Sequence, residues 1–150
     1  MTPVFDFPDA VKAFVAAGIF TPGRQFGPST AIGFANADEG LVAGFVYHNF
    51  EPDAGVVEVS GYSTRRDWVN KSLLNVIFRY PFDQIGCRAV VARHSEQNTR
   101  VIRIWRALGA TQTKIPELRG PNEAEVVAVL TRDAWRKSKF RERQPKSCAA

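Results

Sequence analysis

Residues 62–110 read YSTRRDWVNKSLLNVIFRYPFDQIGCRAVVARHSEQNTRVIRIWRALGA, and this stretch decides the fold. A basic turn at 64–67 leads into a helical run from Trp68 to Phe82, where apolar residues recur at helical spacing. A short apolar strand follows at 89–93, and a second helix ends at 108–110. The first helix start therefore offers free backbone N–H groups beside cationic side chains, which is an arrangement that favours a phosphate.

The rest of the chain adds one helix and a set of antiparallel strands. A helix starts at Asp6 or Pro8 and ends at Ala17, with Gly18 as its C-cap. Strands are expected at 29–35, 41–49, 56–62, 111–115 and 123–131, with a loop at 117–122. This order predicts a mixed α/β sheet of the α+β type, with helices on both faces.

Composition indicates one folded domain with a basic end. The chain has 150 residues, a formal charge of +5 and a pI near 9.6, which favour anionic partners. We assign residues 1–135 to the domain and the basic residues 136–150 to a flexible tail. No apolar run reaches the roughly 18 residues of a membrane span, so we expect a cytoplasmic protein without a membrane partner. Cys87 and Cys148 lack metal-ligand spacing, so no metal is expected.

Three motifs in the central stretch keep a fixed spacing. Residues 80–90 read YPFDQIGCRAV, Asn98 opens the helix that ends at Gly109, and Arg65 opens the basic turn. At these positions the chain resembles the GNAT acetyl-CoA-dependent N-acetyltransferases, over roughly residues 41–131. The resemblance implies a mostly antiparallel sheet in which two parallel strands splay apart.

The resemblance also implies a place for acetyl-CoA, the cosubstrate. It would lie between the splayed strands, 56–62 and 89–93. Backbone groups of Ser60 to Tyr62 would bind the pantetheine arm, and the amides after Arg65 would bind the pyrophosphate. The implied cofactor-binding residues are Ser60, Gly61, Arg65, Arg66, Asp67, Trp68, Val69, Asn70, Asn98 and Trp105.

The chain departs from the family pattern inside these motifs. The glycines of the pyrophosphate loop fall on Arg66 and Trp68, so side chains stand where the backbone would close on a phosphate. Val101 replaces a serine, and Ala110 replaces a phenylalanine. Trp105 replaces the tyrosine that often serves as general acid, and an indole N–H does not titrate in this range. A second interpretation is therefore a GNAT-fold protein that has lost catalysis and acts as a structural or interaction protein.

The second interpretation also rests on a narrower resemblance. The small GNAT-like proteins of short-tailed phages, some of them internal virion components, also lack the glycine loop and end the Asn-led helix in Gly-Ala. This resemblance implies a protein partner in virion assembly and a location in the virion or the host cytoplasm. A third interpretation, nucleic-acid binding through the basic tail, has less support because no aromatic residue beyond Phe140 interleaves with the charges.

Acetyl transfer to an amine requires a group that accepts the amine proton. Glu58 is the first candidate, since it lies mid-strand on the face shared with Ser60 and Tyr62. His94 ends the second splayed strand and titrates in a suitable range, and Tyr62 would donate to the thioester or the leaving group. The structural alternatives are a paired strand charge for Glu58, a loop position for His94 and packing for Tyr62. His48 is expected on the surface.

The first interpretation is therefore an N-acetyltransferase that uses direct attack in a ternary complex. Its acceptor would be a protein N-terminus, a lysine or a small amine, and the sequence does not choose among them.

Overall fold

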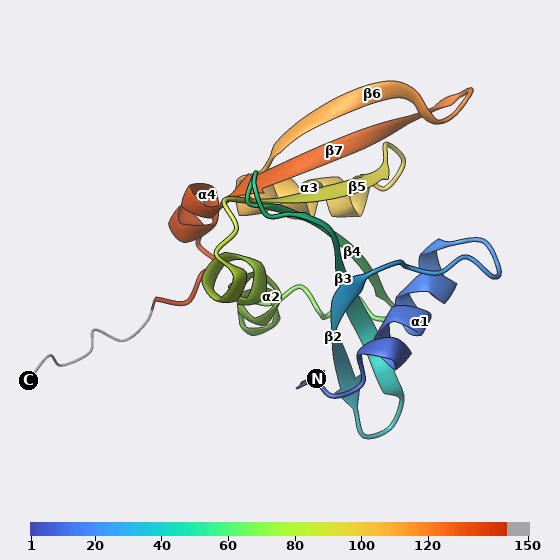
Figure 1. Cartoon of the computed structure of the whole chain (residues 1–150), viewed down its shortest axis with the longest axis vertical. Helices are drawn as coiled ribbons and strands as arrows, with labels where there is room; N and C mark the ends of the chain where they lie inside the picture. The colour runs from blue at the N-terminus through green and yellow to red at the C-terminus, as the bar shows by residue number, and fades with distance from the viewer. Residues whose placement is uncertain (144–150) are drawn as a thin grey trace, which may run out of the picture.

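The computed structural model describes residues 1–143 and contains a seven-stranded mixed sheet. The strand order is β1-β2-β3-β4-β5-β7-β6, as Figure 1 shows. Strands β4 and β5 are parallel, and the other neighbouring strands pair antiparallel. The expected mixed α/β sheet with one parallel pair is confirmed.

The elements follow in chain order. They are β1 (Thr2–Val4), α1 (Pro8–Ile19), β2 (Ser29–Asn36), β3 (Gly40–Glu51), β4 (Val56–Ser63), α2 (Lys71–Arg79), the π-helical turn η1 (Tyr80–Ile85), β5 (Ala89–Ser95), α3 (Thr99–Leu108), β6 (Thr111–Gly120), β7 (Glu123–Thr131) and α4 (Arg132–Lys137).

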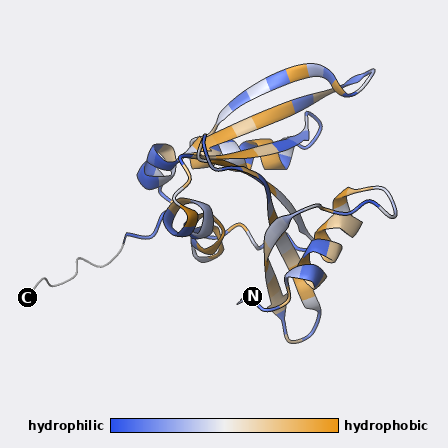
Figure 2. Cartoon of the chain, viewed as in Figure 1, coloured by the Kyte–Doolittle hydropathy of each residue, from blue (hydrophilic) through white to orange (hydrophobic). Residues whose placement is uncertain are grey.

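Helices cover both faces of the sheet, as expected. α1 packs on β2, β3 and β4 through Val11 and Val15, and it lies across the sheet from α2 in Figure 1. The other face packs against α2, α3 and α4 in the main core. That core includes Phe45, Val59, Leu74, Phe78, Val90, Trp105, Leu130 and Trp135. Figure 2 shows that β7, inside the sheet, is more hydrophobic than β6 at its edge. Among the described residues, no helix is long and apolar enough to cross a membrane.

Helix α2 begins later than the sequence predicts. Its start at Lys71 replaces the expected start at 66–68, because Asn70 is extended and its side-chain oxygen caps a backbone N–H of the first turn at 2.9 Å. Beyond Arg79 the chain widens into η1, which contains Pro81. Proline lacks the N–H that an α-helical turn needs, so a wider turn is tolerated there. Gly86, with φ of 80°, ends the segment as expected.

The last hairpin is longer than the sequence predicts. β6 extends to Gly120, whereas we expected a loop at 117–122. Glu117 has φ of 62°, and the register with β7 shifts between Ile115 and Gly120, so a bulge bends the strand. Antiparallel pairing with β7 resumes at Gly120 and places Leu118 and Arg119 near the tip of the hairpin.

The segment after β7 packs on α2. Trp135 of α4 is buried, and its ring centroid lies 4.9 Å from that of Phe78. The side chain of Asn75 donates to the carbonyl of Phe140 at 2.6 Å and accepts from the amide of Glu142 at 2.8 Å. The first part of the expected 136–150 tail is therefore held against the domain. Residues 144–150 of that tail lie outside the described residues.

Candidate functional site

The parallel strands β4 and β5 pair at one end only. Their register covers Val56 to Glu58 against Ala89 to Val91, and it ends there. Within residues 1–143, the edge of β4 that faces β5 has no strand partner beyond Glu58, so its backbone groups are free for a ligand. The expected pair of splayed parallel strands is present, and Glu58 lies at the point of separation.

A cleft of about 910 Å³ occupies the space between the separated strands. Its walls come from β3 and β4, from the end of β5, from α2 and α3, from the loop after α1 and from the β6–β7 hairpin. It reaches both faces of the sheet. The lining residues on the α1 face include Phe26, His48 and Tyr62, and those on the α2 and α3 face include Trp68, Ile104 and Trp105.

Glu58 belongs to a polar cluster at this point. Its carboxylate lies 3.5 Å from Nε2 of His48 and accepts a hydrogen bond from Nδ2 of Asn49 at 3.2 Å. The same His48 nitrogen lies 2.8 Å from Oγ of Ser60. The Glu58 and His48 side chains are only 17% and 14% exposed, so they form a shielded carboxylate and imidazole pair within the cleft.

His48 was wrongly expected to be a surface residue. The β3–β4 register places it directly opposite Glu58, and the Phe26 ring covers it with a centroid distance of 5.1 Å. Burial lowers the pKa of His48, and the nearby Arg93 lowers it further, against an opposing effect of Glu58. The imidazole is therefore neutral at pH 7. The turn at 51–55 was visible in the sequence, but the register shifts between His48 and Glu51, so counting back from the end of the hairpin does not by itself pair the two positions.

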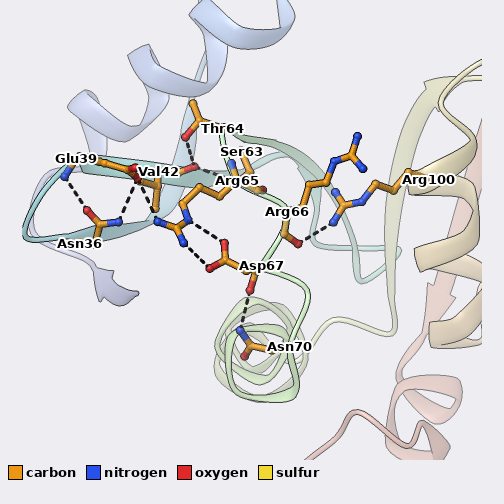
Figure 3. Close-up of polar contacts among 10 residues, drawn as sticks. All are labelled: Asn36, Glu39, Val42, Ser63, Thr64, Arg65, Arg66, Asp67, Asn70 and Arg100. Atoms are coloured by element: carbon orange, nitrogen blue, oxygen red, sulfur yellow. Dashed lines mark hydrogen bonds and ion pairs between the residues drawn. The ribbon is translucent and has the colours of Figure 1, made fainter.

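In the loop between β4 and α2, the first arginine, Arg65, binds two carboxylates, as Figure 3 shows. The Arg65 guanidinium donates to both oxygens of Asp67 at 2.9 and 2.8 Å and lies 3.4 Å from Glu39. The hydrogen bond from Arg65 lowers the pKa of the Asp67 carboxyl. The Arg65 amide donates to the hydroxyl of Ser63 at 3.0 Å. Both the charge and the amide of Arg65 are thus used inside the protein.

A second arginine, which the sequence reasoning missed, joins the two walls of the cleft. Arg100 of α3 donates from Nη2 to the carbonyl of Arg66 at 2.7 Å (Figure 3). Its guanidinium also lies 6.0 Å from the Trp68 ring centroid. Nothing in the sequence separates Arg100 from the neighbouring arginines of the same helix, because the contact depends on the path of a loop 34 residues earlier.

No family model and no curated protein matches the chain. Solved structures do match. Mutant forms of the spermidine/spermine N-acetyltransferase SpeG from Vibrio cholerae share 9% identity at a TM-score of 0.63, covering 73% of this chain and 70% of that one. The ribosomal-protein-S5-alanine acetyltransferase from Vibrio fischeri shares 14% identity at a TM-score of 0.61, covering 71% of this chain and 63% of that one. The chain spans 64% of the length of the first matched acetyltransferase structure.

The protein has the GNAT fold. Identities of 9% and 14% make this a likeness of fold. The expected resemblance to GNAT acetyltransferases is confirmed at that level.

The cleft of this GNAT fold brings together only part of the expected site. Of the implied cofactor-binding residues, those in the cleft lining are Ser60, Gly61, Trp68, Asn98 and Trp105. Those outside the lining are Arg65, Arg66, Asp67, Val69 and Asn70. All three catalytic candidates, Glu58, Tyr62 and His94, line the cleft. The strand positions therefore reach the cleft, whereas most of the loop positions do not.

Tyr62 packs tightly against α1 within the GNAT-fold cleft. A Cβ built on Gly18 would lie 2.3 Å from Cγ of the Tyr62 ring, so only glycine allows this contact. The Phe14 ring lies 5.4 Å away, measured between centroids. Gly18 was wrongly expected to cap α1, since the helix continues to Ile19 and ends at an extended Phe20. The small residue allows the close approach of Tyr62.

His94 lies on the opposite face of β5 from the Glu58 cluster. Its side chain is buried, and within the described residues neither ring nitrogen has a hydrogen-bond partner. Burial lowers the pKa of His94. The β4–β5 register pairs Glu58 with Val91, so Arg93 shares the face of Glu58 and His94 does not. The structure therefore does not bring His94 to the carboxylate.

The helix N-terminus on the far wall of the cleft is capped as expected. The side chain of Asn98 accepts a hydrogen bond from the Val101 amide at 3.3 Å, and Gly109 ends the helix with φ of 96°. Trp105 is buried, and its ring contacts Phe78 edge to face. Both tryptophans of the cleft are wall residues, and the space between the strands stays open.

Proposed function

We propose that the protein is an N-acetyltransferase that moves an acetyl group from acetyl-CoA to an amine by direct attack. The observation that carries the proposal is the open cleft between β4 and β5, with the shielded carboxylate of Glu58 where the strands separate. The known acetyltransferase structures of the same fold support the assignment.

The pantetheine arm of acetyl-CoA fits the unpaired edge of β4. Beyond Glu58 this edge offers the backbone groups of Ser60 and Gly61, which would pair with the amides of the arm. The opposite wall offers the side chain of Asn98 for a further hydrogen bond. The apolar side chains of Trp68 and Trp105 would enclose the arm on the α2 and α3 face.

The phosphates would meet a different set of residues from the one that the family loop implies. Arg65 is bound to Asp67 and Glu39, so it is not free for a phosphate. We assign the phosphates to the side chains of Arg66 and Arg100 and to the amides of the loop at 66–69. Arg100 already reaches the loop carbonyl of Arg66, so a small movement would turn it to a phosphate.

Glu58 would act as the base. The amine nitrogen attacks the thioester carbonyl carbon, Glu58 takes the proton that the amine loses, and the carbon–sulfur bond breaks. Tyr62 would protonate the departing thiolate, and the proton held by Glu58 would return to Tyr62 through solvent, which restores both groups. His48 and Asn49 hold the Glu58 carboxylate in place. Because the His48 imidazole is neutral, it does not compete with the acceptor ammonium for the negative charge of Glu58. The catalytically inactive interpretation has less support, because Trp68 and Trp105 do not fill the cleft.

Acetyl-CoA binding measured by calorimetry tests the proposal. We expect micromolar affinity for the unmodified chain and a large loss in the double variant Arg66→Ala/Arg100→Ala. The control is Arg103→Ala, an exposed arginine of α3 outside the cleft lining. Absence of binding at millimolar acetyl-CoA would overturn the acetyltransferase assignment. Equal binding by all three proteins would overturn the phosphate assignment alone.

A further inference from the structure

We propose that the acceptor is a small amine that also carries a carboxylate, and that arginines on the α1 face of the cleft bind this carboxylate. The inference rests on the proposed acetyl transfer, because it places the acceptor amine at Glu58. It names the chemical class of the acceptor, which the sequence left open.

The first arginine, Arg24, lies over an aromatic ring in the loop after α1. The Arg24 guanidinium lies 4.1 Å from the Phe20 ring centroid. The Phe20 ring contacts Phe26 at 4.9 Å between centroids, and Phe26 contacts His48 at 5.1 Å. Within the described residues, no carboxylate lies within 4.0 Å of Arg24, so its charge is uncompensated. The Arg24 guanidinium is thus linked through the rings of Phe20 and Phe26 to His48, which pairs with Glu58.

Two further arginines are fixed by one buried carboxylate. Arg93 donates from Nε and Nη2 to one oxygen of Glu125 at 3.0 and 2.8 Å, and Arg119 donates to the other oxygen at 3.0 Å. The Glu125 side chain is 4% exposed, whereas those of Arg93 and Arg119 are 48% and 39% exposed. The carboxylate therefore orients both guanidinium groups, and each keeps donors on its exposed side.

The charges that line the cleft favour an acceptor with a cationic end and an anionic end. Four arginines line the cleft against two carboxylates, Glu58 and Glu125. Glu125 is already bound by two arginines, whereas Glu58 contacts a neutral imidazole and an amide. An acceptor ammonium is therefore attracted to Glu58, and its anionic end is attracted to Arg24, Arg93 and Arg119.

This arrangement disfavours a polyamine. A second ammonium group would face cations along the same wall, and like charges brought together in a shielded cleft reduce binding. The inferred acceptor thus differs from spermidine, which appears in the name of the SpeG acetyltransferase of the same fold. An acid group at the far end of the acceptor would be favoured instead.

A series of ω-amino acids, from glycine to 6-aminohexanoate, tests the inference when each acid is compared with its own amide. Binding is measured by calorimetry on the full chain with CoA present. Each pair has the same amine and the same length and differs in the charge of the far end. We expect the best acid to bind about tenfold or more tightly than its amide, and more tightly than spermidine. Arg24→Gln should remove most of this preference, whereas Arg103→Gln should keep it.

A second variant separates folding from binding. Arg119→Gln should also reduce the preference, and a loss of structure in that variant would leave the Arg24→Gln result to decide. Equal binding of acids and amides, stronger binding of spermidine, or no binding of any member would overturn the inference. Consumption of acetyl-CoA is followed separately. Preference for acids without any acetyl transfer would support the carboxylate site and overturn the acetyltransferase assignment.

Discussion

Two clusters of ion pairs, one in the cleft and one in the loop beside it, differ in how far solvent reaches them. On the α1 face, Glu125 is buried and binds Arg93 and Arg119, so the arginines are fixed by a carboxylate that solvent does not reach. On the α2 face, Arg65 binds Asp67 and Glu39, and both of those carboxylates are more than half exposed. Buried pairs hold geometry, whereas exposed pairs contribute little and rearrange readily. The proposed acceptor end is therefore preformed, and the proposed phosphate end can adapt to its ligand.

The largest expected effect is on the chemistry between the two ends. Glu58→Gln keeps the size of the side chain and removes the proton acceptor, so kcat should fall about 10² to 10³-fold. The rate is measured with the best acceptor of the series, and acetyl-CoA affinity should not change. Glu51→Gln, an exposed glutamate at the end of β3, is the matched control. An unchanged kcat in Glu58→Gln would remove this residue from the mechanism.

The next largest effect is a loss of stability on removing Glu125, which we compare with the removal of Asp67 from the exposed ion pair. Glu125→Ala leaves Arg93 and Arg119 without their shared partner, and we expect the free energy of unfolding to drop by about 2 kcal/mol. The loss should stay below that of a fully buried pair, because water reaches both arginines. Asp67→Ala, at the exposed pair, should leave the free energy of unfolding unchanged. Denaturant unfolding measures both variants, and equal losses would contradict the contrast between the two ends.

The smallest effect is a pH dependence of stability from the two imidazoles. Burial lowers the pKa of both His48 and His94 below the ordinary value of 6.5. As the pH falls through 6.5 the unfolded chain binds these protons before the folded chain does. The free energy of unfolding should therefore decrease, by at most about 1.4 kcal/mol per pH unit for each histidine.

Charged groups on neighbouring elements act on both histidines. Glu58 and Arg93 act on His48, and Arg119 and Glu125 act on His94. Asp67 and Glu96 have lowered pKa values, so their contributions are lost only at a lower pH than those of the histidines. Urea unfolding from pH 7.5 to 5.5 should show the decrease, with a smaller slope in His94→Gln. A flat profile would show that the imidazoles take up protons without unfolding.

Residue spacing was enough to predict most of the elements and their order. Apolar spacing defined α1 and α3, Asn98 and Gly109 marked the ends of α3, and strand alternation placed Glu58 on one face with Ser60. These features depend on residues a few positions apart, so local geometry is enough to specify them. Local signals also misled at the start of α2, where Asn70, rather than the basic turn before it, supplies the cap.

Contacts between distant side chains depend on how the whole chain folds. His48 reaches Glu58 because of the β3–β4 register, and Arg65 is neutralised partly by Glu39, 26 residues earlier in the chain. Arg24 stands over Phe20 because of the path of one loop. Strand register and loop path are set by packing across the whole domain, which residue spacing does not encode. The sequence therefore predicted a GNAT-like fold with Glu58 on the first of the two splayed strands. The charged residues that surround Glu58 became evident only in the folded chain.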